Sequence, residues 1–390
     1  MRDTAHQEKF FEEYVVTKLK AQGWKEGDTR NYDTERALYP EDIIAWLNNS
    51  GQGDKWAKLQ KDNGERACNT LMDRLAKTLG QHGTTHVLRN GFSIAGCGHI
   101  DLSEAAPEDK RNEDILKRYA ANILRVVPQL KYHPARELAI DLVLFINGIP
   151  VATVELKTDF TQSAEAAMDQ YRYDRAPYDP KTKRREPLLT FKRGAVVHFA
   201  MSDSEIRMTT KLNGENTHFL PFNQGNVGHS GNPPRTDGEY PVAYFWESVC
   251  QRDAWLRIFH SFVYVEKKDV ADLKGNWSKK ETLIFPRYHQ WSAVNEMIDD
   301  ARKNGPGMQY LAEHSAGSGK TSTISWTAHD LVKLRRDNGD AIFNSVIIVT
   351  DRTVLDSQLQ DAVKQIDHQF GVIAGIDRKK SSKSKSKQLS

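Results

Sequence analysis

The sequence contains no long hydrophobic run and few cysteines, and both absences narrow what the chain can be. No stretch of about 18 consecutive apolar residues occurs, so no segment is predicted to cross a membrane. The opening residues 1–10 are polar and lack the apolar core of a secretory signal. Cys68, Cys97 and Cys250 are far apart and odd in number, which argues against a zinc knuckle or a disulfide framework. A reducing cytoplasm is the expected location.

The composition is that of a globular protein, with 38% hydrophobic and 27% charged residues. A chain of 390 residues is too long for one ordinary core, so two domains are the natural expectation. The net charge of +3 neither requires nor excludes a nucleic-acid partner, because a local basic groove matters more than the total charge.

Hydrophobic periodicity gives a first outline of the chain. It predicts helices at residues 7–22, 40–47, 64–79 and 244–264. Runs rich in β-formers predict strands at residues 85–88, 137–145, 151–156 and 194–201. Residues 213–238 are rich in glycine, proline and asparagine and predict an extended surface loop. Residues 274–280 are expected to link to a second α/β region that begins near Ile284, and residues 378–390 are a Lys/Ser-rich tail expected to be mobile.

Two strand-like runs flank Asn147-Gly148 in the segment ELAIDLVLFINGIPVATVELK, which is a strong signal for a β-hairpin. In the second strand Glu155 and Lys157 are two residues apart, so they point to the same face. A two-residue turn would place Asp141 on the opposite face, since it would pair with Val154.

A three-residue loop with Gly148 as the left-handed bulge residue would instead pair Asp141 with Thr153. Asp141, Glu155 and Lys157 would then share one face. We therefore predict an odd-length or bulged connection in this hairpin.

Two carboxylates and an ammonium group on one face fit metal-dependent phosphodiester chemistry. Carboxylate oxygens bind Mg²⁺, which stabilises charge on a phosphate and lowers the pKa of a bound water. Lys157 can orient that water or stabilise the charged transition state. The alternative is a solvated, purely structural face. The surrounding apolar runs LVLF and VATV favour the functional interpretation, because buried charges require a reason.

A predicted helix at residues 163–175 follows this hairpin, with Ser163 as its cap, and can direct Gln170 towards the same site. An ordinary surface position for Gln170 is the alternative. Basic and aromatic residues follow closely and suit a phosphate-backbone surface, although, taken alone, they are better explained by a solvated helix and loop. They are Arg172, Arg175, Lys181, Lys183, Arg184 and Arg185, with Tyr171, Tyr173 and Tyr178.

A second motif, GSGKT, lies between a predicted strand in MQYLAEHS and a predicted helix. Its members are Gly317, Ser318, Gly319, Lys320 and Thr321. In such a loop, glycine backbone N–H groups surround phosphate oxygens, the lysine reaches the β and γ phosphates, and the Thr321 hydroxyl binds Mg²⁺. His314 stands where the strict pattern has glycine. A further predicted strand, residues 345–350, would complete a βαβ unit.

The segments on either side of this loop add two motifs. FPRYHQ, with Gln290, resembles the adenine-reading glutamine motif of superfamily 2 helicases, and an amide offers a donor and an acceptor to an adenine edge. Phe285 or Tyr288 is a candidate to stack near the base. VTDRTVLDSQL resembles helicase motif Ia, in which Arg352 is the candidate for a nucleic-acid contact. No DExx box follows the loop, so this chain alone is expected to hydrolyse ATP slowly or not at all.

The spacing Asp-x13-Glu-x-Lys resembles the PD-(D/E)xK nuclease pattern, and the full series of motifs resembles the restriction subunit of type I restriction-modification enzymes. The series is DLVLFINGIPVATVELK, QYRYDR, FLPFNQG, FPRYHQ, GSGKT and VTDRTVLDSQL. The resemblance implies ATP-driven translocation and Mg²⁺-dependent cleavage of double-stranded DNA, in a complex with methyltransferase and specificity subunits.

The resemblance also assigns roles to residues. Asp141, Glu155 and Lys157 match the catalytic positions of the family, with Asp141 and Glu155 as metal ligands, and Gln170 matches its helix glutamine. The tyrosine expected four residues later is Asp174 here, and Tyr173 comes one position early. Glu12 is a candidate auxiliary acid, for which an ordinary amphipathic helix is the simpler explanation.

We therefore expect an α/β protein with three parts. They are a PD-(D/E)xK endonuclease domain at residues 1–235, a connecting segment at 236–279, and the first part of a RecA-like ATPase domain at 280–390. Mg²⁺ and ATP are the expected cofactors. A stand-alone helicase-nuclease is one alternative, and a DNA-binding module with purely structural carboxylates is another. A metal-binding test would distinguish the latter.

Overall fold

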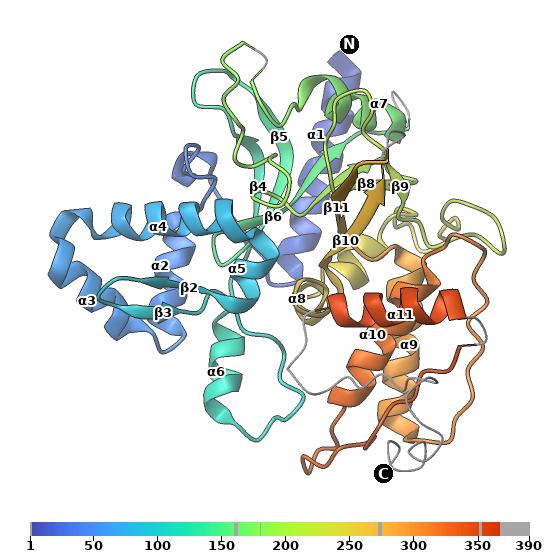
Figure 1. Ribbon diagram of the computed structural model, residues 1–390. Coiled ribbons are helices and arrows are strands. Elements are labelled where there is room, and N and C mark those ends of the chain that lie inside the picture. The colour runs from blue at the N-terminus through green and yellow to red at the C-terminus, as the bar shows by residue number, and fades with distance from the viewer. Residues whose placement is uncertain (1, 160–162, 180, 272–274, 351–352, 367–390) are drawn as a thin grey trace. The chain divides into compact units, whose positions relative to one another are not determined.

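The computed structural model describes residues 2–159, 163–179, 181–271, 275–350 and 353–366 (Figure 1). The chain forms two compact units, Met1–Val263 with Leu283–Ser292, and Tyr264–Thr282 with Ala293–Ser390. Each unit is described by itself. Among the described residues, no helix is both long enough and apolar enough to cross a membrane.

A seven-stranded mixed sheet forms the centre of the first unit, in the order β1-β4-β5-β6-β7-β8-β9 (Figure 1). Its strands are β1 (Lys25–Glu26), β4 (Leu124–Lys131), β5 (Ala139–Ile146), β6 (Ile149–Leu156), β7 (Val197–Met201), β8 (Ile206–Thr209) and β9 (Leu220–Pro221). β1 is parallel to β4 and β6 is parallel to β7, whereas the other neighbouring pairs are antiparallel. This arrangement confirms the predicted α/β class with a mixed sheet.

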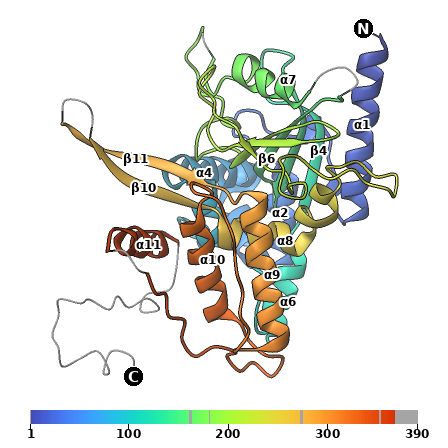
Figure 2. The same cartoon turned by 90° about the vertical axis from the view of Figure 1, so that its right-hand side faces the viewer.

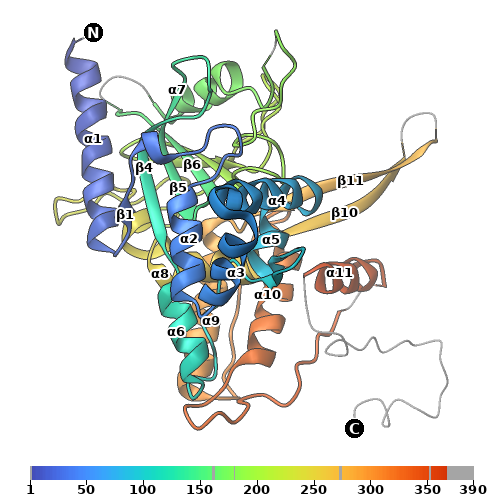
Figure 3. The same ribbon diagram turned by 90° about the vertical axis from the view of Figure 1, so that its left-hand side faces the viewer.

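Helices surround this sheet, and the long helix α1 contacts β4 and β6 (Figure 2). Helices α2 to α5, which Figure 3 shows from another side, lie together beside the small hairpin β2–β3 (Figure 1). The helical elements are α1 (Arg2–Ala21), η1 (Thr29–Asn31), α2 (Pro40–Asn49), α3 (Gly53–Asn63), η2 (Gly64–Arg66), α4 (Ala67–His82), α5 (Thr84–Asn90), α6 (Glu113–Ala121), α7 (Ala164–Asp169), η3 (Gln170–Asp174), η4 (Phe245–Val249), α8 (Arg252–Arg257) and η5 (Ile258–Phe262). The hairpin strands are β2 (Phe92–Ile94) and β3 (Gly98–Ile100).

The sequence predicted most of these elements, but not all. The helices at residues 7–22, 40–47, 64–79 and 244–264 and the strands at 137–145, 151–156 and 194–201 are confirmed. The strand predicted at residues 85–88 is wrong, because these residues lie in helix α5. There Thr84 Oγ1 donates to the carbonyl of Gly194 at 2.9 Å, and Val87 and Leu88 are buried, so tertiary packing overrides the β propensity of the segment.

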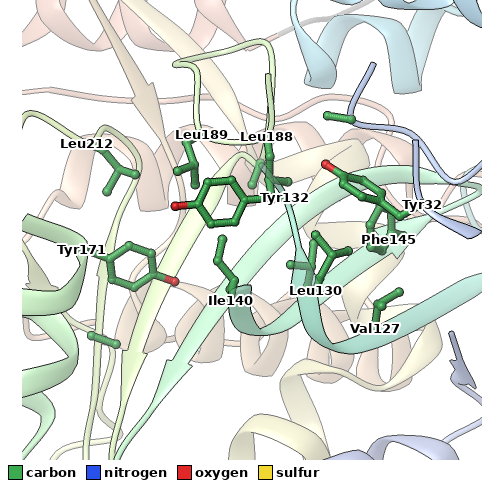
Figure 4. Packing of buried hydrophobic residues seen from close by; sticks show 14 of the residues in the cluster. Tyr32, Val127, Leu130, Tyr132, Ile140, Phe145, Tyr171, Leu188, Leu189 and Leu212 are labelled. Atoms are coloured by element: carbon green, nitrogen blue, oxygen red, sulfur yellow. The ribbon is translucent and has the colours of Figure 1, made fainter. Parts of the chain in front are cut away.

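A hydrophobic cluster covers the face of the sheet that carries Thr153 and lies beneath α7 and η3 (Figure 4). Tyr171, Ile140 and Tyr132 meet Leu188, Leu189 and Leu212 there. Burial of large side chains on this scale fixes the positions of the strands. The polar site described below lies at the edge of this core.

The second unit contains the β10–β11 ribbon and the helices around the GSGKT loop (Figure 2). Its elements are β10 (Tyr264–Ala271), β11 (Trp277–Ile284), α9 (Tyr288–Asn304), α10 (Lys320–Lys333) and α11 (Thr353–Gln365), of which β11 and α9 extend into the first unit. α10 contacts α11, and α11 contacts β10.

Two expectations for this unit are wrong. The polar segment 274–280, predicted as a linker, contributes its described residues from Trp277 onwards to strand β11. Residues 308–315 and 345–350, predicted as the two strands of a βαβ unit, form no strand in the described part of the chain, so that unit is not formed there. Val349 is 86% exposed and Leu311, before the loop, is 91% exposed. An apolar run becomes a strand only where a neighbour accepts its backbone hydrogen bonds.

Candidate active site

The hairpin that carries the predicted site contains a bulge, as expected, but not at its turn. Asn147 and Gly148 form a two-residue turn with φ of +48° and +81°, values that suit an Asn-Gly pair. The register then shifts by one residue on β6, where Val151 has no direct partner. The bulged connection is therefore confirmed, and the three-residue loop is wrong.

This shifted register brings the two predicted carboxylates together. Thr153 pairs with Val143, not with Asp141 as predicted, and Leu142 pairs with Val154. One step further in the same register, Asp141 lies opposite Glu155, so the two side chains share a face. Asp141 and Glu155 therefore share a face, as predicted, although the predicted pairing of Asp141 with Thr153 is wrong.

The Glu155 carboxylate is fully buried. Its Oε1 accepts a hydrogen bond from Arg175 Nε at 2.6 Å, whereas its Oε2 receives no hydrogen bond from the residues that the structure describes. Burial raises the pKa of Glu155 well above its ordinary value, the Asp141 carboxylate raises this pKa further, and the Arg175 guanidinium lowers it. Asp141 Oδ2 accepts a hydrogen bond from the backbone N–H of Leu156 at 2.7 Å.

Arg175, which reaches Glu155, follows a helix that changes from α-helical to π-helical geometry. Ser163 caps α7, as predicted, by accepting a hydrogen bond from the Glu165 N–H at 3.3 Å. The π-helix η3 then follows, a rare form that often occurs at functional sites. Arg175, directly after η3, is only 6% exposed and also donates to the carbonyl of Ala139 at 2.7 Å.

Lys157 lies two residues beyond Glu155, with only 13% of its side chain exposed. Its Nζ donates a hydrogen bond to Glu8 Oε2 at 3.3 Å. Glu8 belongs to helix α1, one turn before Glu12, and these two glutamates lie on the same side of the helix. Glu8 was not predicted from the sequence, although its spacing of four residues from Glu12 indicates that both lie on the same side of the helix.

Glu12 lies close to Asp141 and is connected to it by one side chain. Gln129 Nε2 donates to Glu12 Oε2 and also to Asp141 Oδ1, the latter at 3.2 Å. Burial raises the pKa of Glu12 to about 7, and the Asp141 carboxylate contributes in the same direction. Glu12 is therefore part of the acidic site, which an ordinary amphipathic helix does not explain.

The helix glutamine of the prediction, Gln170, begins the π-helix η3, and its Oε1 is buried without a hydrogen-bond partner in the described part of the chain. The adjacent Tyr171 is fully buried and shares a hydrogen bond of 2.7 Å with Thr153 Oγ1. Thr153 Oγ1 also lies 2.8 Å from His198 Nδ1. Tyr173, the tyrosine considered from the sequence, is 62% exposed, so Tyr171 is the tyrosine that packs beside the site.

The basic residues within and after η3 do not form a free basic surface as a group. Arg172 pairs with Glu165 and Asp169, Arg175 with Glu155, and Arg184 with Glu35. Lys181, Lys183 and Arg185 are exposed, and Lys183 lies over the Tyr178 ring at 5.7 Å. Three of the six basic residues are thus used in ion pairs within the chain.

The donor set fits a divalent cation better than a purely structural role. Glu155 Oε2 and Gln170 Oε1 are buried oxygens without a hydrogen-bond donor, and Asp141 and Glu155 are like charges in a region of low exposure. A hard cation would satisfy such oxygens and offset the repulsion. No group of three or more His, Cys, Asp or Glu side chains in the described part of the chain could hold a metal, so Glu12 is a neighbour of the Asp141 and Glu155 pair and not a third ligand.

The GSGKT loop lies in the second unit. Gly317 and Gly319 have φ of +75° and +86°, and helix α10 begins at Lys320. Lys320 Nζ donates to the carbonyls of His314 and Ser315 at 2.6 and 2.9 Å. Ser318 is buried, and Thr321 lies in the first turn of α10, where backbone N–H groups point out of the helix end.

Gln290 belongs to the first unit, at the start of α9. It is 4% exposed, and its Oε1 accepts a hydrogen bond from the Arg287 N–H at 2.9 Å. Phe285 and Tyr288, the candidates for base stacking, pack against Phe222. Arg352 lies outside the described residues, as do the C-terminal residues 367–390.

The sequence matches the family model for the type I restriction enzyme R protein N terminus over residues 7–217, more than half of the chain. The chain belongs to this family, which confirms the resemblance. Residues 289–389 match the SWI2/SNF2 ATPase family.

Two curated relatives carry names of the same kind. A protein of Methanocaldococcus jannaschii, assigned as the type I restriction enzyme MjaVIIIP endonuclease subunit, is 27% identical over 254 residues, which cover 63% of this chain and 22% of the relative. The type I restriction enzyme HindI endonuclease subunit of Haemophilus influenzae is 24% identical over 244 residues, which cover 59% of this chain and 21% of the relative. The aligned part of this chain thus spans less than a quarter of either relative's length.

Proposed function

We propose that this chain is the nuclease-bearing part of a type I restriction subunit and that it hydrolyses DNA phosphodiester bonds with the help of Mg²⁺. The observation that carries the proposal is the buried, unpartnered Oε2 of Glu155 beside the Asp141 carboxylate, with Lys157 on the same face. The R-protein family match and the names of both relatives agree with this chemistry.

Asp141 and Glu155 would hold the cation, and the buried Oε1 of Gln170 would be available as a further ligand. When bound, Mg²⁺ supplies charge stabilisation at the phosphate and a more acidic water. Arg175 and the Leu156 N–H each hold one carboxylate oxygen of the pair, which fixes the direction of the others. Metal ligands are commonly oriented in this way, by hydrogen bonds from the groups around them.

Lys157 would stabilise the negative charge that develops on the phosphate in the transition state. The Glu8 carboxylate holds the ammonium group at the site before substrate binds. The phosphate can replace Glu8 as the partner of Lys157, because both are anionic oxygen acceptors.

The second part of the proposal concerns ATP. Lys320 and the backbone of residues 317–321 would bind the nucleotide phosphates, Thr321 would bind the Mg²⁺ that accompanies them, and Gln290 would contact the adenine. The carbonyls of His314 and Ser315 hold the Lys320 ammonium group where a phosphate would otherwise bind it. The match to SWI2/SNF2 ATPases supports this assignment and a RecA-like domain.

We propose the domain limits 1–235, 236–279 and 280–390, with a PD-(D/E)xK fold for the first. The partners that follow from the names of the relatives are double-stranded DNA and the methyltransferase and specificity subunits. In the full complex, ATP-driven translocation of DNA would be coupled to cleavage.

The test separates the two chemistries in the assembled complex. Lys157→Ala should lower DNA cleavage at least about 100-fold, because a charge that stabilises the transition state is lost, and should leave ATP binding unchanged. Lys320→Ala should remove ATP binding and leave Mg²⁺ binding at Asp141 and Glu155 unchanged. Lys61→Ala, an exposed position in α3, is the matched control. Equal loss of cleavage and ATP binding in Lys157→Ala would refute the separation of roles.

A further inference from the structure

Strand β4 is interrupted at a single residue beside the carboxylate site. Pro128 pairs with Leu142 and Leu130 pairs with Ile140, but the pair between them, Gln129 with Asp141, is missing from the ladder. Gln129 has φ of +45°, a left-handed conformation that side-chain-bearing residues rarely adopt. Such strain persists only where the surroundings enforce it, and it is concentrated at functional sites.

The unusual backbone places one amide between two carboxylates. Gln129 Nε2 carries two hydrogens, and it donates to Glu12 Oε2 and to Asp141 Oδ1. Because the Leu156 N–H holds Oδ2 of the same carboxylate, Asp141 is fixed through both of its oxygens. Gln129 therefore determines the direction in which the remaining lone pairs of Asp141 point.

The stability of the strand gives no reason for a glutamine here. Gln129 is exposed and lies outside the hydrophobic cluster of the sheet. Glycine would adopt the left-handed conformation with less strain. What glutamine offers and glycine lacks is the amide that joins Glu12 to Asp141.

We propose that Gln129 is a positioning residue for the cation site, which holds Asp141 in its metal-binding orientation and offsets the repulsion between the Glu12 and Asp141 carboxylates through a shared donor. This inference rests on the proposed metal-dependent function. Loss of a group that orients a metal ligand typically lowers metal affinity 10–100-fold. Without the amide, the two carboxylates face each other with no shared donor, so their repulsion turns them apart.

The experiment is a Mn²⁺ titration of the 390-residue chain by calorimetry at constant pH. Gln129→Leu and Gln129→Gly should both raise the dissociation constant 10–100-fold, and Gln129→Asn, which tolerates the left-handed backbone and keeps an amide, should retain part of the affinity. Gln60→Leu, at an exposed glutamine in α3, should bind like the wild type.

Thermal unfolding without metal distinguishes a positioning role from a structural one. Gln129→Gly should unfold at the wild-type temperature or above it, because the backbone strain is relieved, and yet bind Mn²⁺ more weakly. Gln129→Gly also preserves the test if Gln129→Leu fails to fold.

The outcomes distinguish this inference from the function on which it rests. Suppose that the wild type binds Mn²⁺, that Asp141→Ala does not, and that Gln129→Leu and Gln129→Gly bind like the wild type. The positioning role is then refuted, and the proposed function stands. If the wild type and Asp141→Ala titrate identically, the metal site itself is refuted, and the role of Gln129 with it.

Discussion

The β5–β6 hairpin of the first unit and the segments around the GSGKT loop of the second unit have similar apolar sequences but different structures. In β6, the run VATVEL pairs with strands on both sides and every residue is buried. In the second unit, the run SVIIVT pairs with no strand in the described part of the chain, and Val349 is 86% exposed. Sequence composition alone therefore does not make a strand, because partner strands must supply the hydrogen bonds.

The difference extends to the functional side chains. Glu155, Arg175 and Asp141 are held by buried contacts within a packed sheet. Lys320 is exposed and is held by two carbonyls of its own loop. The first site is fixed by tertiary structure, whereas the second is fixed mainly by local backbone geometry.

The largest expected effect contrasts the charged residues of the two regions. Arg175→Leu leaves Glu155 buried without its cationic partner and should lower the free energy of unfolding by about 3–5 kcal/mol. Lys320→Leu should change it by no more than about 0.5 kcal/mol, because the side chain is exposed. Urea denaturation measures both. Arg172→Leu, which breaks a more exposed pair, is the control and should cost less than about 1 kcal/mol. Similar losses for Arg175→Leu and Arg172→Leu would refute the assigned difference in burial.

A pair of leucines sharpens the comparison. Leu144 in β5 is fully buried, and Leu311 before the loop is 91% exposed. Leu144→Ala should cost about 2–5 kcal/mol, since it removes apolar contacts and leaves a cavity. Leu311→Ala should lie within about 0.5 kcal/mol of the wild type. Comparable costs in thermal or urea unfolding would show that Leu311 is packed in solution, and the contrast between the units would fail.

The buried polar network of the first unit predicts a pH dependence. Burial lowers the pKa of His198 to about 3, whereas histidine in an unfolded chain titrates near about 6.5. Between these values the unfolded chain binds more protons than the folded chain, so stability falls as the pH falls, by up to about 1.4 kcal/mol per pH unit. His198→Gln should remove this contribution. The unfolding free energies of His198→Gln and of the wild type would be measured from pH 7 to pH 4. The difference between them should change with pH, and a constant difference would contradict the lowered pKa of His198.

The smallest effect concerns Glu12, whose pKa is raised to about 7 by burial. The folded chain holds this proton more tightly than the unfolded chain, so the stability that Glu12 provides is lost as the pH rises from about 4.5 to about 7. Glu12→Gln should therefore be more stable relative to the wild type at pH 8 than at pH 5. The gain should be below about 1 kcal/mol, since the side chain is partly screened by solvent. A relative stability that does not change between these pH values would place Glu12 in solvent.

Local patterns in the sequence were sufficient for much of the site. The Asn-Gly turn, the alternation in β6 and the requirement that Asp141 and Glu155 share a face together predicted a bulged hairpin, which the structure confirms at Val151. Ser163 was recognised as a helix cap from its position alone. These features depend on neighbours within a few residues, where pattern rules are strongest.

The remaining site residues come from distant segments and carried weak signals. β4 was not predicted, because Pro128 interrupts its apolar run and proline rarely lies within a central strand. Gln129 was therefore missed, and Arg175 was expected either on a DNA surface or in a solvated helix and loop, because nothing local marks it as buried. The strand predicted at residues 345–350 failed for the opposite reason, since its local pattern is strong but no partner strand is present among the described residues.

The most direct test of the central claim is a Mg²⁺ or Mn²⁺ titration by calorimetry with a short DNA duplex present. Wild type, Asp141→Ala and the isosteric Glu155→Gln would be compared. The wild type should bind the metal saturably. Both substitutions should abolish this binding or weaken it strongly, since each removes a charged metal ligand. Identical titrations of all three proteins would contradict this prediction, because the hairpin carboxylates would then be structural in this chain.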